Sequence, residues 1–432
     1  MSTRTTRSFS ITDSETLQKQ ALRWANQYSH LTFFNNNDIA YPFGAFENRL
    51  AVGCAQELRV TNINGEDTFA NLQAFHQQHQ DWLVGYLSYD LKNEIEQLSS
   101  QNQDGLLFPL ACFYQPIHLI DFLDNEVVIH SLEDPESIFQ AIIGTPDTPE
   151  LPPSLPLAIQ ASVVKSDYLQ RVEAIRQHII EGDVYELNYC IEFFAKEADI
   201  MPLQLYAQLN QLSPTPFSVY QRIDSFYLLC ASPERFLQKK GSRLISQPIK
   251  GTTRRGKDEE EDQQLKEWLR NDEKELAENM MIVDLVRNDL ARSALTGSVK
   301  VEEMFGIYSF RQVNQMISTV SAQIRASIPF TEAIRNAFPM GSMTGAPKIR
   351  AMELIEQYER TKRGLYSGAV GYISPNGDFD FNVVIRSMLY NARNRYLSFQ
   401  VGSAITYDSV PAQEYEECLL KAKAMFEVLG AG

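Results

Sequence analysis

Apolar residues recur at helical spacing in four segments of the second half of the chain. In the first segment, Tyr168, Val172, Ile175 and Ile179 fall on one helical face, and Gly182 follows where a helix often ends in glycine. Two of the later segments open with proline, which is common in the first helical turn. The pattern predicts helices over residues 165–181, 274–292, 347–360 and 411–429.

Short apolar runs bounded by turn residues predict strands between these helices. Residues 226–230 form one such run, and residues 379–389 form another that follows the turn-forming sequence Pro-Asn-Gly-Asp at 375–378. If 379–389 is one continuous strand, the alternation of side chains puts Arg386 on the same face as Asn382.

A proline-rich stretch divides the sequence into two parts. Residues 144–156 hold five prolines in a short polar segment, which is typical of a linker. We therefore expect an N-terminal region over residues 1–143 and a larger C-terminal domain over residues 157–432. The N-terminal region has aromatic, strand-prone runs at 81–89 and 107–114, and it carries no catalytic motif.

The composition narrows the class of protein. The chain has 432 residues, of which 44% are hydrophobic, enough for a sizeable core. Its formal net charge of −16 offers no attractive field to nucleic acid or to an anionic membrane surface, so we expect neither as a partner. No run approaches the roughly 18 apolar residues of a membrane helix, and the polar N-terminus shows no secretory signal. The five cysteines include no Cys-x-x-Cys pair, which favours a cytoplasmic protein with reduced thiols.

Histidines are confined to the first part of the chain. None of the six lies beyond His178. This excludes a Ser-His-Asp or Cys-His triad built wholly from the C-terminal part, and it excludes a His-ligated zinc site there. Chemistry in that part must therefore use carboxylates, lysines, tyrosines or a hard metal ion.

Two of the predicted helices carry glutamates spaced three residues apart. Glu275 and Glu278 form the first pair, and Glu414 and Glu417 form the second. This spacing puts both carboxylates of a pair on one face of the helix. A solvated acidic face is the usual explanation of a single pair. Apolar neighbours of the first pair indicate a buried helix, however, and two converging pairs would suit an oxygen-preferring cation such as Mg²⁺.

Lys250 lies in a run bracketed by a proline and a glycine. The sequence Pro-Ile-Lys-Gly-Thr-Thr-Arg-Arg at 248–255 suggests a strand end that breaks into a turn. An amine in this setting is a nucleophile, an anion clamp or an ordinary loop lysine. Residues 341–348 form a Gly-rich turn before a predicted helix, which indicates either an anion site at the helix N-terminus or simple turn chemistry.

Two further charged residues follow or end predicted strands. Glu234 comes shortly after the run 226–230, and burial at a strand end would raise the pKa of its carboxyl group toward the range of a general acid or base. Arg386 falls near the end of the run 379–389. Its guanidinium could bind a carboxylate in bidentate fashion, and the alternative is a salt bridge between strands.

Taken together, these segments resemble the chorismate-binding enzymes, a family that includes anthranilate synthase component I, aminodeoxychorismate synthase component I, and the isochorismate and salicylate synthases. The resemblance covers roughly residues 160–428 in family order, and the N-terminal region is only loosely similar. The motifs that carry it are Glu-Gly-Asp-Val-Tyr-Glu-Leu-Asn at 181–188, Ser-Pro-Glu-Arg-Phe at 232–236, Pro-Ile-Lys-Gly-Thr at 248–252, residues 278–290, residues 341–348, Ser-Gly-Ala-Val-Gly-Tyr at 367–372, and residues 414–421. The implied fold is an α+β sandwich of two large antiparallel sheets packed face to face, with helices outside.

The resemblance also implies roles for individual residues of a catalytic domain over 157–432. Glu278 and Glu417 would ligate Mg²⁺, while Glu275 and Glu414 would contact its waters. The metal would chelate the ring carboxylate of chorismate. The residues at positions where relatives contact the substrate are Thr252, Lys348, Tyr372, Arg386 and Gly402.

Within the family, the residue at position 250 distinguishes the branches. Anthranilate, isochorismate and salicylate synthases usually have alanine there, whereas aminodeoxychorismate synthases have a nucleophilic lysine. The resemblance thus implies amination of chorismate at C4 to 4-amino-4-deoxychorismate, a precursor of 4-aminobenzoate and folate. The reaction would pass through a covalent adduct on Lys250, and Glu234 would protonate the departing hydroxyl. We expect Arg254, Arg255 or burial to lower the pKa of Lys250.

Three positions depart from the family pattern. Glu186 replaces a glutamine that is common in amine-forming members, and isochorismate and salicylate synthases have a base lysine there. Gln315 replaces a usual histidine, and Ser403-Ala404 replaces a glycine pair. None of the three indicates a different chemistry.

The sequence contains no recognisable glutaminase to supply ammonia. Such a site needs a nucleophilic cysteine with a histidine partner, and Gly-Cys-Ala at 53–55 has no matching His-x-Glu sequence. We therefore expect a separate glutaminase subunit as a partner, or the use of free ammonia. The nearest alternative function is that of anthranilate synthase component I, and a non-catalytic chorismate-binding subunit is the alternative of another class.

Overall fold

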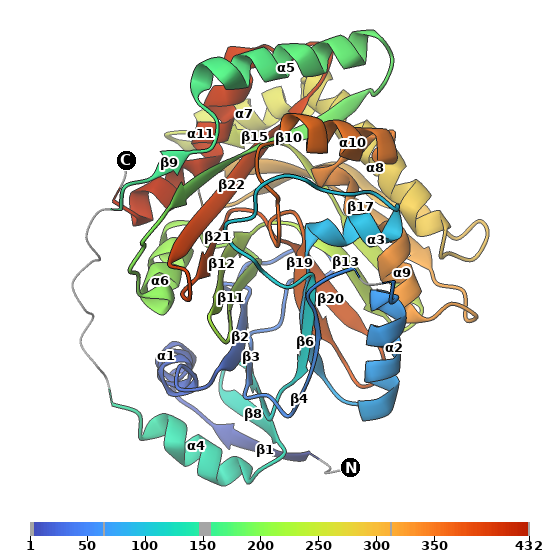
Figure 1. Ribbon diagram of the computed structural model, residues 1–432. Coiled ribbons are helices and arrows are strands. Elements are labelled where there is room, and N and C mark those ends of the chain that lie inside the picture. The colour runs from blue at the N-terminus through green and yellow to red at the C-terminus, as the bar shows by residue number, and fades with distance from the viewer. Residues whose placement is uncertain (1–3, 64, 147–156, 312, 431–432) are drawn as a thin grey trace.

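The computed structural model describes residues 4–63, 65–146, 157–311 and 313–430. Two large antiparallel sheets pack face to face, and helices cover the outside (Figure 1). This α+β sandwich is the fold that the family resemblance implies, and that prediction is confirmed. The predicted linker at 144–156 falls mostly outside the described residues, which end at 146 and resume at 157.

The larger sheet has 12 strands. In order across the sheet they are β1 (Thr5–Ser10), β8 (Glu126–Ser131), β7 (His118–Phe122), β3 (Arg49–Val52), β2 (His30–Asn35), β11 (Phe217–Ile223), β12 (Phe226–Ser232), β21 (Ser387–Asn391), β22 (Tyr396–Ile405), β10 (Glu186–Ala195) and β18 (Gly345–Ala346), with β9 (Gln160–Ala161) beside β10.

The smaller sheet has 10 strands. Their order is β15 (Ile249–Arg254), β17 (Val313–Gln323), β14 (Arg243–Gln247), β13 (Arg235–Lys240), β20 (Phe379–Val383), β19 (Ala369–Ile373), β5 (Leu83–Leu87), β6 (Ala111–Gln115) and β4 (Gln56–Val60), with β16 (Lys300–Ser309) beside β17.

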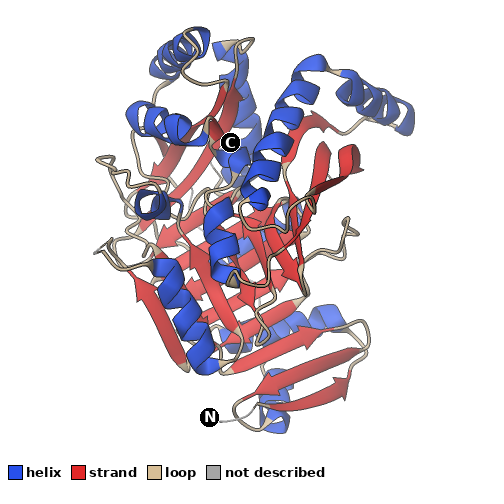
Figure 2. Ribbon diagram, turned by 90° about the vertical axis from the view of Figure 1, so that its right-hand side faces the viewer, coloured by secondary structure: helices blue, strands red, loops and turns tan. Residues whose placement is uncertain are grey.

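The helices lie on the outer surfaces of these sheets, as Figure 2 shows by colour. They are α1 (Ser14–Ala25), α2 (Thr68–His79), α3 (Lys92–Ile95), α4 (Pro135–Ile143), α5 (Lys165–Ile180), α6 (Pro202–Leu212), α7 (Glu259–Asn271), α8 (Glu273–Ala291), α9 (Phe330–Ala337), α10 (Lys348–Tyr358) and α11 (Pro411–Val428), with 3₁₀ turns η1 (Tyr89–Leu91) and η2 (Gly341–Met343). None of the helices in the described ranges is both long and apolar enough to cross a membrane.

Strands from both sides of the proline-rich stretch contribute to each sheet. In the larger sheet β2 pairs with β11, and in the smaller sheet β5 pairs with β19. The N-terminal region therefore completes the same two sheets as the C-terminal part. The division into an N-terminal region over residues 1–143 and a catalytic domain over residues 157–432 therefore stays a prediction.

Two hydrophobic cores result because the larger sheet is covered on both faces. Leu389 of β21 packs between the two sheets with residues such as Phe381, whereas its neighbour Met388 packs on the opposite face, beneath the helices. Successive residues of a strand point to opposite faces, so a strand buried on both sides is apolar at nearly every position. Figure 1 shows α5, α10 and α11 gathered at one end of the molecule and α1 and α4 at the other.

The four predicted helices are confirmed as α5, α8, α10 and α11, within a few residues at each end. Asp272 caps the start of α8, because its side chain accepts a hydrogen bond from the backbone N–H of Glu275. Pro347 is the N-cap of α10 rather than its first residue. Periodic apolar residues and start signals together place these elements well.

The predicted strand over 379–389 is wrong, because the run forms two strands. β20 ends at Val383 in the smaller sheet, and β21 begins at Ser387 in the larger one. Between them Arg386 has a φ of 51°, a left-handed backbone conformation that interrupts the alternation. Arg386 therefore does not share a strand face with Asn382. The run contains no glycine or proline that would mark this crossing.

Candidate active site

A cavity of about 610 Å³ lies between the two sheets and helices α8 and α11. It is of the size that a small-molecule ligand needs. Most of the residues predicted to take part in chemistry line it. They are Glu234, Lys250, Thr252, Glu275, Glu278, Arg386, Gly402 and Glu417.

The backbone around Lys250 directs its side chain into this cavity. Strands β14 and β15 follow one another along β17, with Pro248 between them, and the pairing of β15 shifts between Ile249 and Thr252. Such a bulge adds a residue to one strand and re-aims a side chain. Gly251 has a φ of 95°, and a Cβ atom there would lie 3.1 Å from Cβ of Met316. Lys250 therefore sits in a bulged strand rather than at the predicted strand end.

Lys250 is paired with a buried carboxylate from the other sheet. Its Nζ donates a hydrogen bond of 2.6 Å to Oε1 of Glu186, the first residue of β10. Only 10% of the Lys250 side chain and 2% of the Glu186 side chain are exposed. Burial alone would lower the pKa of Lys250, but Glu186, Glu278 and Glu417 outweigh it and raise the pKa above its ordinary value.

The expectation that arginines or burial would lower the pKa of Lys250 is therefore wrong. Arg254 pairs with Glu261, and Arg255 pairs with Asp262 at 2.8 Å, so both guanidiniums are engaged with helix α7. The field at Lys250 is instead set by carboxylates. The free amine that a nucleophile requires must arise by passing the proton to a neighbouring group.

Glu234 has the properties of a proton donor at neutral pH. It lies after β12, is 4% exposed, and accepts a hydrogen bond of 2.6 Å from Oγ of Ser342 in η2. Burial raises the pKa of Glu234 to about 7, although the Ser342 hydroxyl and the charge of Lys250 act in the opposite direction. The prediction of a buried carboxyl with a raised pKa at this strand end agrees with the structure.

The four glutamates of the two predicted pairs lie on one side of the cavity. Glu275, Glu278 and Glu417 line it, and Glu414 is buried behind them. Lys274 lies among them, with its Nζ 3.3 Å from Glu414 and 3.7 Å from Glu278. One oxygen of Glu278 and one of Glu414 are buried without a hydrogen-bond partner in the described part of the chain.

Burial and neighbouring carboxylates disfavour the charged form of Glu278 on this side of the cavity. Burial raises the pKa of Glu278 to about 8, with Glu186 and Glu275 adding to the rise against Lys250 and Lys274. Buried carboxylates with unpartnered oxygens fit a hard divalent cation, and Lys274 stands where such a cation would neutralise them. The four carboxylates are spread apart. In the described residues, groups of three possible ligand atoms within 4.8 Å of one another occur elsewhere, at His30–Cys54–Glu57 and His178–Glu181–Asp183.

Arg386 provides a cationic group that faces the cavity without a partner. Among the described residues, its side chain makes no recorded hydrogen bond or ion pair, and burial lowers the pKa of its guanidinium. A buried charge without a counter-charge is costly unless a ligand supplies one. Arg386 therefore fits a carboxylate of a bound anion, which agrees with its predicted role.

Three predicted site residues do not line the cavity. Tyr372 is 9% exposed and packs with Phe34 and Trp82 in the core between the sheets. Lys348 donates to Asp289 at 2.6 Å and to the carbonyl of Pro339, so its amine is engaged. Glu414, the third, reaches the site only through Lys274. A contact of Tyr372 or Lys348 with a ligand in this cavity is not favoured by their positions.

Two contacts at the site were not predicted from the sequence. Glu186 was recognised as a departure from the family, but its contact with Lys250 joins strands of different sheets and leaves no local pattern. Ser342 belongs to the Gly-rich turn, and its hydroxyl holds Glu234. The signals in the sequence that could have pointed to these two contacts were the unusual residue at position 186 and the Gly-rich turn at 341–348.

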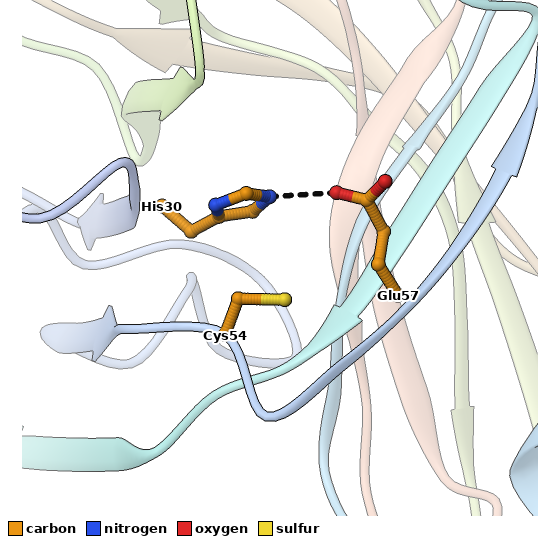
Figure 3. Close-up of side chains that lie close together, drawn as sticks. All are labelled: His30, Cys54 and Glu57. Carbon is orange, nitrogen blue, oxygen red and sulfur yellow. Dashed lines mark hydrogen bonds and ion pairs between the residues drawn. The ribbon is translucent and has the colours of Figure 1, made fainter.

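A second cluster of reactive residue types lies outside the cavity (Figure 3). It brings Cys54 and Glu57, which are three residues apart, close to His30 from an earlier strand. His30 is fully engaged, since Nε2 contacts Glu57 at 2.6 Å and Nδ1 contacts Ser29 at 3.0 Å. Arg59 holds both oxygens of Glu57. Burial raises the pKa of Cys54 to about 11, so this cysteine is not an activated glutaminase nucleophile.

Comparisons with known proteins identify relatives of this chain in sequence and in fold. The aminodeoxychorismate synthase component 1 of Bacillus subtilis is 34% identical over 365 residues, which cover 81% of this chain and 77% of that protein. The anthranilate synthase component 1 of Thermus thermophilus is 34% identical over 360 residues, covering 80% and 77%. The crystal structure of anthranilate synthase component I from Streptococcus pneumoniae superimposes with a TM-score of 0.78 at 27% identity, covering 90% of this chain and 93% of that one.

The family match extends beyond the C-terminal motifs. The sequence pattern described as "chorismate binding enzyme" matches residues 14–427, so it includes most of the N-terminal region. The chain thus belongs to the chorismate-binding enzymes.

Proposed function

We propose that this chain aminates chorismate at C4 to give 4-amino-4-deoxychorismate, the activity named in its aminodeoxychorismate synthase relatives. The observation that carries the proposal is the amine of Lys250 in the cavity, beside a proton acceptor and in the same cavity as the proton donor Glu234. An anthranilate synthase needs no such nucleophile. Relatives of both kinds are about equally similar in sequence, so this side chain favours one of the two.

The reaction divides into two displacements that share Lys250. In the first, the neutral amine of Lys250 forms a bond to C2 of the ring, the two conjugated ring double bonds both shift, and the C4–oxygen bond breaks. Glu234 gives its proton to the departing hydroxyl, which leaves as water. In the second, ammonia adds at C4, both double bonds shift back, and the C2–nitrogen bond to Lys250 breaks. Glu234 takes the extra proton from the new amine, so the cycle consumes ammonia and releases water.

The anionic groups of chorismate match the cationic side chains of the cavity. Arg386 fits one carboxylate, and the hydroxyl of Thr252 and the backbone of Gly402 line the same space. A Cβ atom at Gly402 would lie 2.5 Å from Sγ of Cys190, so the backbone approaches this wall closely and leaves room only for glycine. We infer that these three residues orient the ring.

We infer that Glu278 and Glu417 hold Mg²⁺, with Glu275 and Glu414 beside them. The buried, unpartnered oxygens of Glu278 and Glu414, the raised pKa of Glu278 and the nearby Lys274 support this assignment. Bound Mg²⁺ would neutralise a carboxylate of the substrate next to the glutamates. Lys274 would have to move aside, since its amine lies against the same carboxylates.

The ammonia would come from a separate glutaminase subunit or from free ammonia. The "component 1" names of the relatives imply a partner subunit for those proteins. The one cysteine that lies beside a histidine and a glutamate here, among the described residues, is not activated. We therefore propose a complex with a glutaminase.

A product assay separates the two amine-forming activities. The protein is incubated with chorismate, Mg²⁺ and an ammonium salt, with and without an added aminodeoxychorismate lyase. The proposal expects 4-aminobenzoate only when the lyase is present. Direct formation of fluorescent anthranilate without the lyase would show that the activity is that of an anthranilate synthase. Tight chorismate binding without turnover would indicate a non-catalytic binding subunit.

A further inference from the structure

Glu186 is the carboxylate in direct contact with the amine of Lys250. It is 1% exposed, and its Oε1 accepts the hydrogen bond of 2.6 Å from Lys250 Nζ. Its Oε2 is buried and has no hydrogen-bond partner in the described ranges. That oxygen is therefore free to accept a further hydrogen bond or a proton.

The other charged groups facing Lys250 are farther from its amine. They are Glu234 after β12, Arg254 on β15, Lys274, Glu275 and Glu278 on α8, Arg386 between β20 and β21, and Glu417, Lys421, Lys423 and Glu427 on α11. Within the described residues, Glu186 is the one partner recorded for the Lys250 amine by hydrogen bond or ion pair. Among the described residues, no hydrogen bond or ion pair joins Glu186 or the Lys250 side chain to any of the four glutamates proposed to surround the metal.

We propose that Glu186 is a catalytic base that takes the proton of Lys250 and keeps it while the lysine is bound to the substrate. This inference rests on the proposed function. Before the first displacement, a proton moves from Lys250 Nζ to Glu186, which leaves a neutral amine and a neutral carboxylic acid. The amine forms the C2–nitrogen bond as a cationic secondary amine. When ammonia expels it, Lys250 leaves as a neutral amine and takes its proton back from Glu186.

This transfer changes no net charge inside the cavity. An ion pair and a neutral pair have the same total charge, and a low-dielectric site favours the neutral one more than water does. The proton therefore need not cross to solvent. Deprotonation of Lys250 should therefore add no dependence on pH, and the wild-type rate of adduct formation should follow the protonation of Glu234 alone, falling as the pH rises through about 7.

The test is the rate of covalent adduct formation measured against pH. The full-length protein is mixed with chorismate and Mg²⁺ without ammonia, quenched at set times and weighed by intact-protein mass spectrometry between about pH 6.5 and 9. Wild-type protein should form the adduct at a rate that does not increase across this range. Glu186→Gln keeps a hydrogen-bond acceptor but no base, so at neutral pH its rate should be lower than that of the wild type on the order of 100-fold, and the ratio of its rate to the wild-type rate should rise with pH.

Glu192→Gln is the matched control. Glu192 lies on the same strand and is 3% exposed. It accepts a hydrogen bond of 2.6 Å from Oγ of Ser398 and does not line the cavity. The Glu192→Gln variant should form the adduct at the same rate as the wild type. If Glu186→Gln fails to fold, Glu186→Asp carries the test: a slower rate without an increase toward high pH is expected, and a rate that rises with pH contradicts the proposal.

The outcomes distinguish this inference from the proposed function. Absence of any adduct in the wild type at every pH would remove the covalent mechanism itself. An adduct that forms equally fast in wild type and Glu186→Gln at every pH would overturn only the role of Glu186. A Glu186→Gln rate that is lower by the same factor at every pH would mean that Glu186 merely positions Lys250, and it would overturn the base role as well.

Discussion

Two buried ion pairs of this molecule each join a basic side chain to a carboxylate, but they differ in how many further hydrogen-bond partners surround them. Arg235 on β13 and Asp380 on β20 form the interior pair, joined by two hydrogen bonds of 2.9 Å. Arg235 also donates to Gln247 and to the carbonyl of Gly44. Lys250 and Glu186 form the cavity pair, joined by a single hydrogen bond, with one oxygen of Glu186 unpartnered among the described residues.

The difference separates structural from chemical roles. In the interior pair both charged groups are held by several partners, which fixes the geometry and offers no room for a ligand. In the cavity pair the amine borders open space and the carboxylate can accept a proton. A buried ion pair is weak support for stability in either case. A buried carboxylate oxygen without a hydrogen-bond partner, next to a cavity, is what indicates reactivity here.

The largest expected effect comes from breaking the interior pair. Asp380→Asn leaves the Arg235 guanidinium buried without a counter-charge, and we expect the free energy of unfolding to fall by about 3–5 kcal/mol. The matched change Glu186→Gln should cost less than about 1 kcal/mol, because the amide still accepts from Lys250 and other carboxylates face it. Urea unfolding of both variants measures the two values, and equal losses would contradict the distinction between the pairs.

A smaller change in stability is expected when a divalent cation binds to the glutamates beside the cavity pair. Mg²⁺ at 100 times its dissociation constant should stabilise the protein by about 2.7 kcal/mol. Thermal unfolding with Mg²⁺ and with a chelator should show this difference for the wild type and lose it in Glu278→Gln. Glu416→Gln is the control, because Glu416 is exposed on the same helix as Glu417 and pairs with Lys165. A shift that persists in Glu278→Gln would mean that Mg²⁺ binds elsewhere.

Removing the unpartnered guanidinium should weaken substrate binding. A hydrogen bond to a charged group contributes about 1.5–3 kcal/mol, so Arg386→Gln should raise the dissociation constant of chorismate roughly 10- to 150-fold. Calorimetry in a Lys250→Ala background avoids turnover during the measurement. Arg350→Gln, which removes an arginine paired on the surface with Glu353, should leave the affinity unchanged. Unchanged affinity in Arg386→Gln would remove Arg386 from the binding site.

The smallest effect concerns the pH profile set by Glu234. Its acid form is the active one, so kcat/KM should fall as the pH rises through about 7, the pKa to which burial raises this group. Ser342 donates to Glu234 and lowers that pKa, and Ser342→Ala should move the falling limb to higher pH by about 0.4–1 unit. A limb that moves to lower pH, or does not move, would contradict the assignment of Glu234 as the acid.

The sequence was sufficient for the elements with strong periodicity and for naming site residues, most of which line the cavity. Helices α5, α8, α10 and α11 followed from apolar spacing and capping, and the family motifs identified the residues that now line one cavity. The crossing between β20 and β21 could not be predicted, because its left-handed residue is an arginine rather than a glycine.

The contacts between the two sheets could not be predicted from the sequence, and the reason is physical. Glu186 and Lys250 are 64 residues apart and lie on strands of different sheets, so only the packing of those sheets brings them together. The same packing sets the charge around Lys250, and it reversed the expected direction of the pKa shift. Tyr372 matched a family position, yet its surroundings are those of a core aromatic residue.

The central claim is that Lys250 forms a covalent bond to chorismate. Intact-protein mass spectrometry after incubation with chorismate and Mg²⁺, without ammonia, tests it most directly. The account predicts a mass increase equal to chorismate less one water, absent in Lys250→Ala and lost from the wild type when ammonia is added. A wild-type protein that stays unmodified at every time point, yet aminates chorismate once ammonia is supplied, would contradict it.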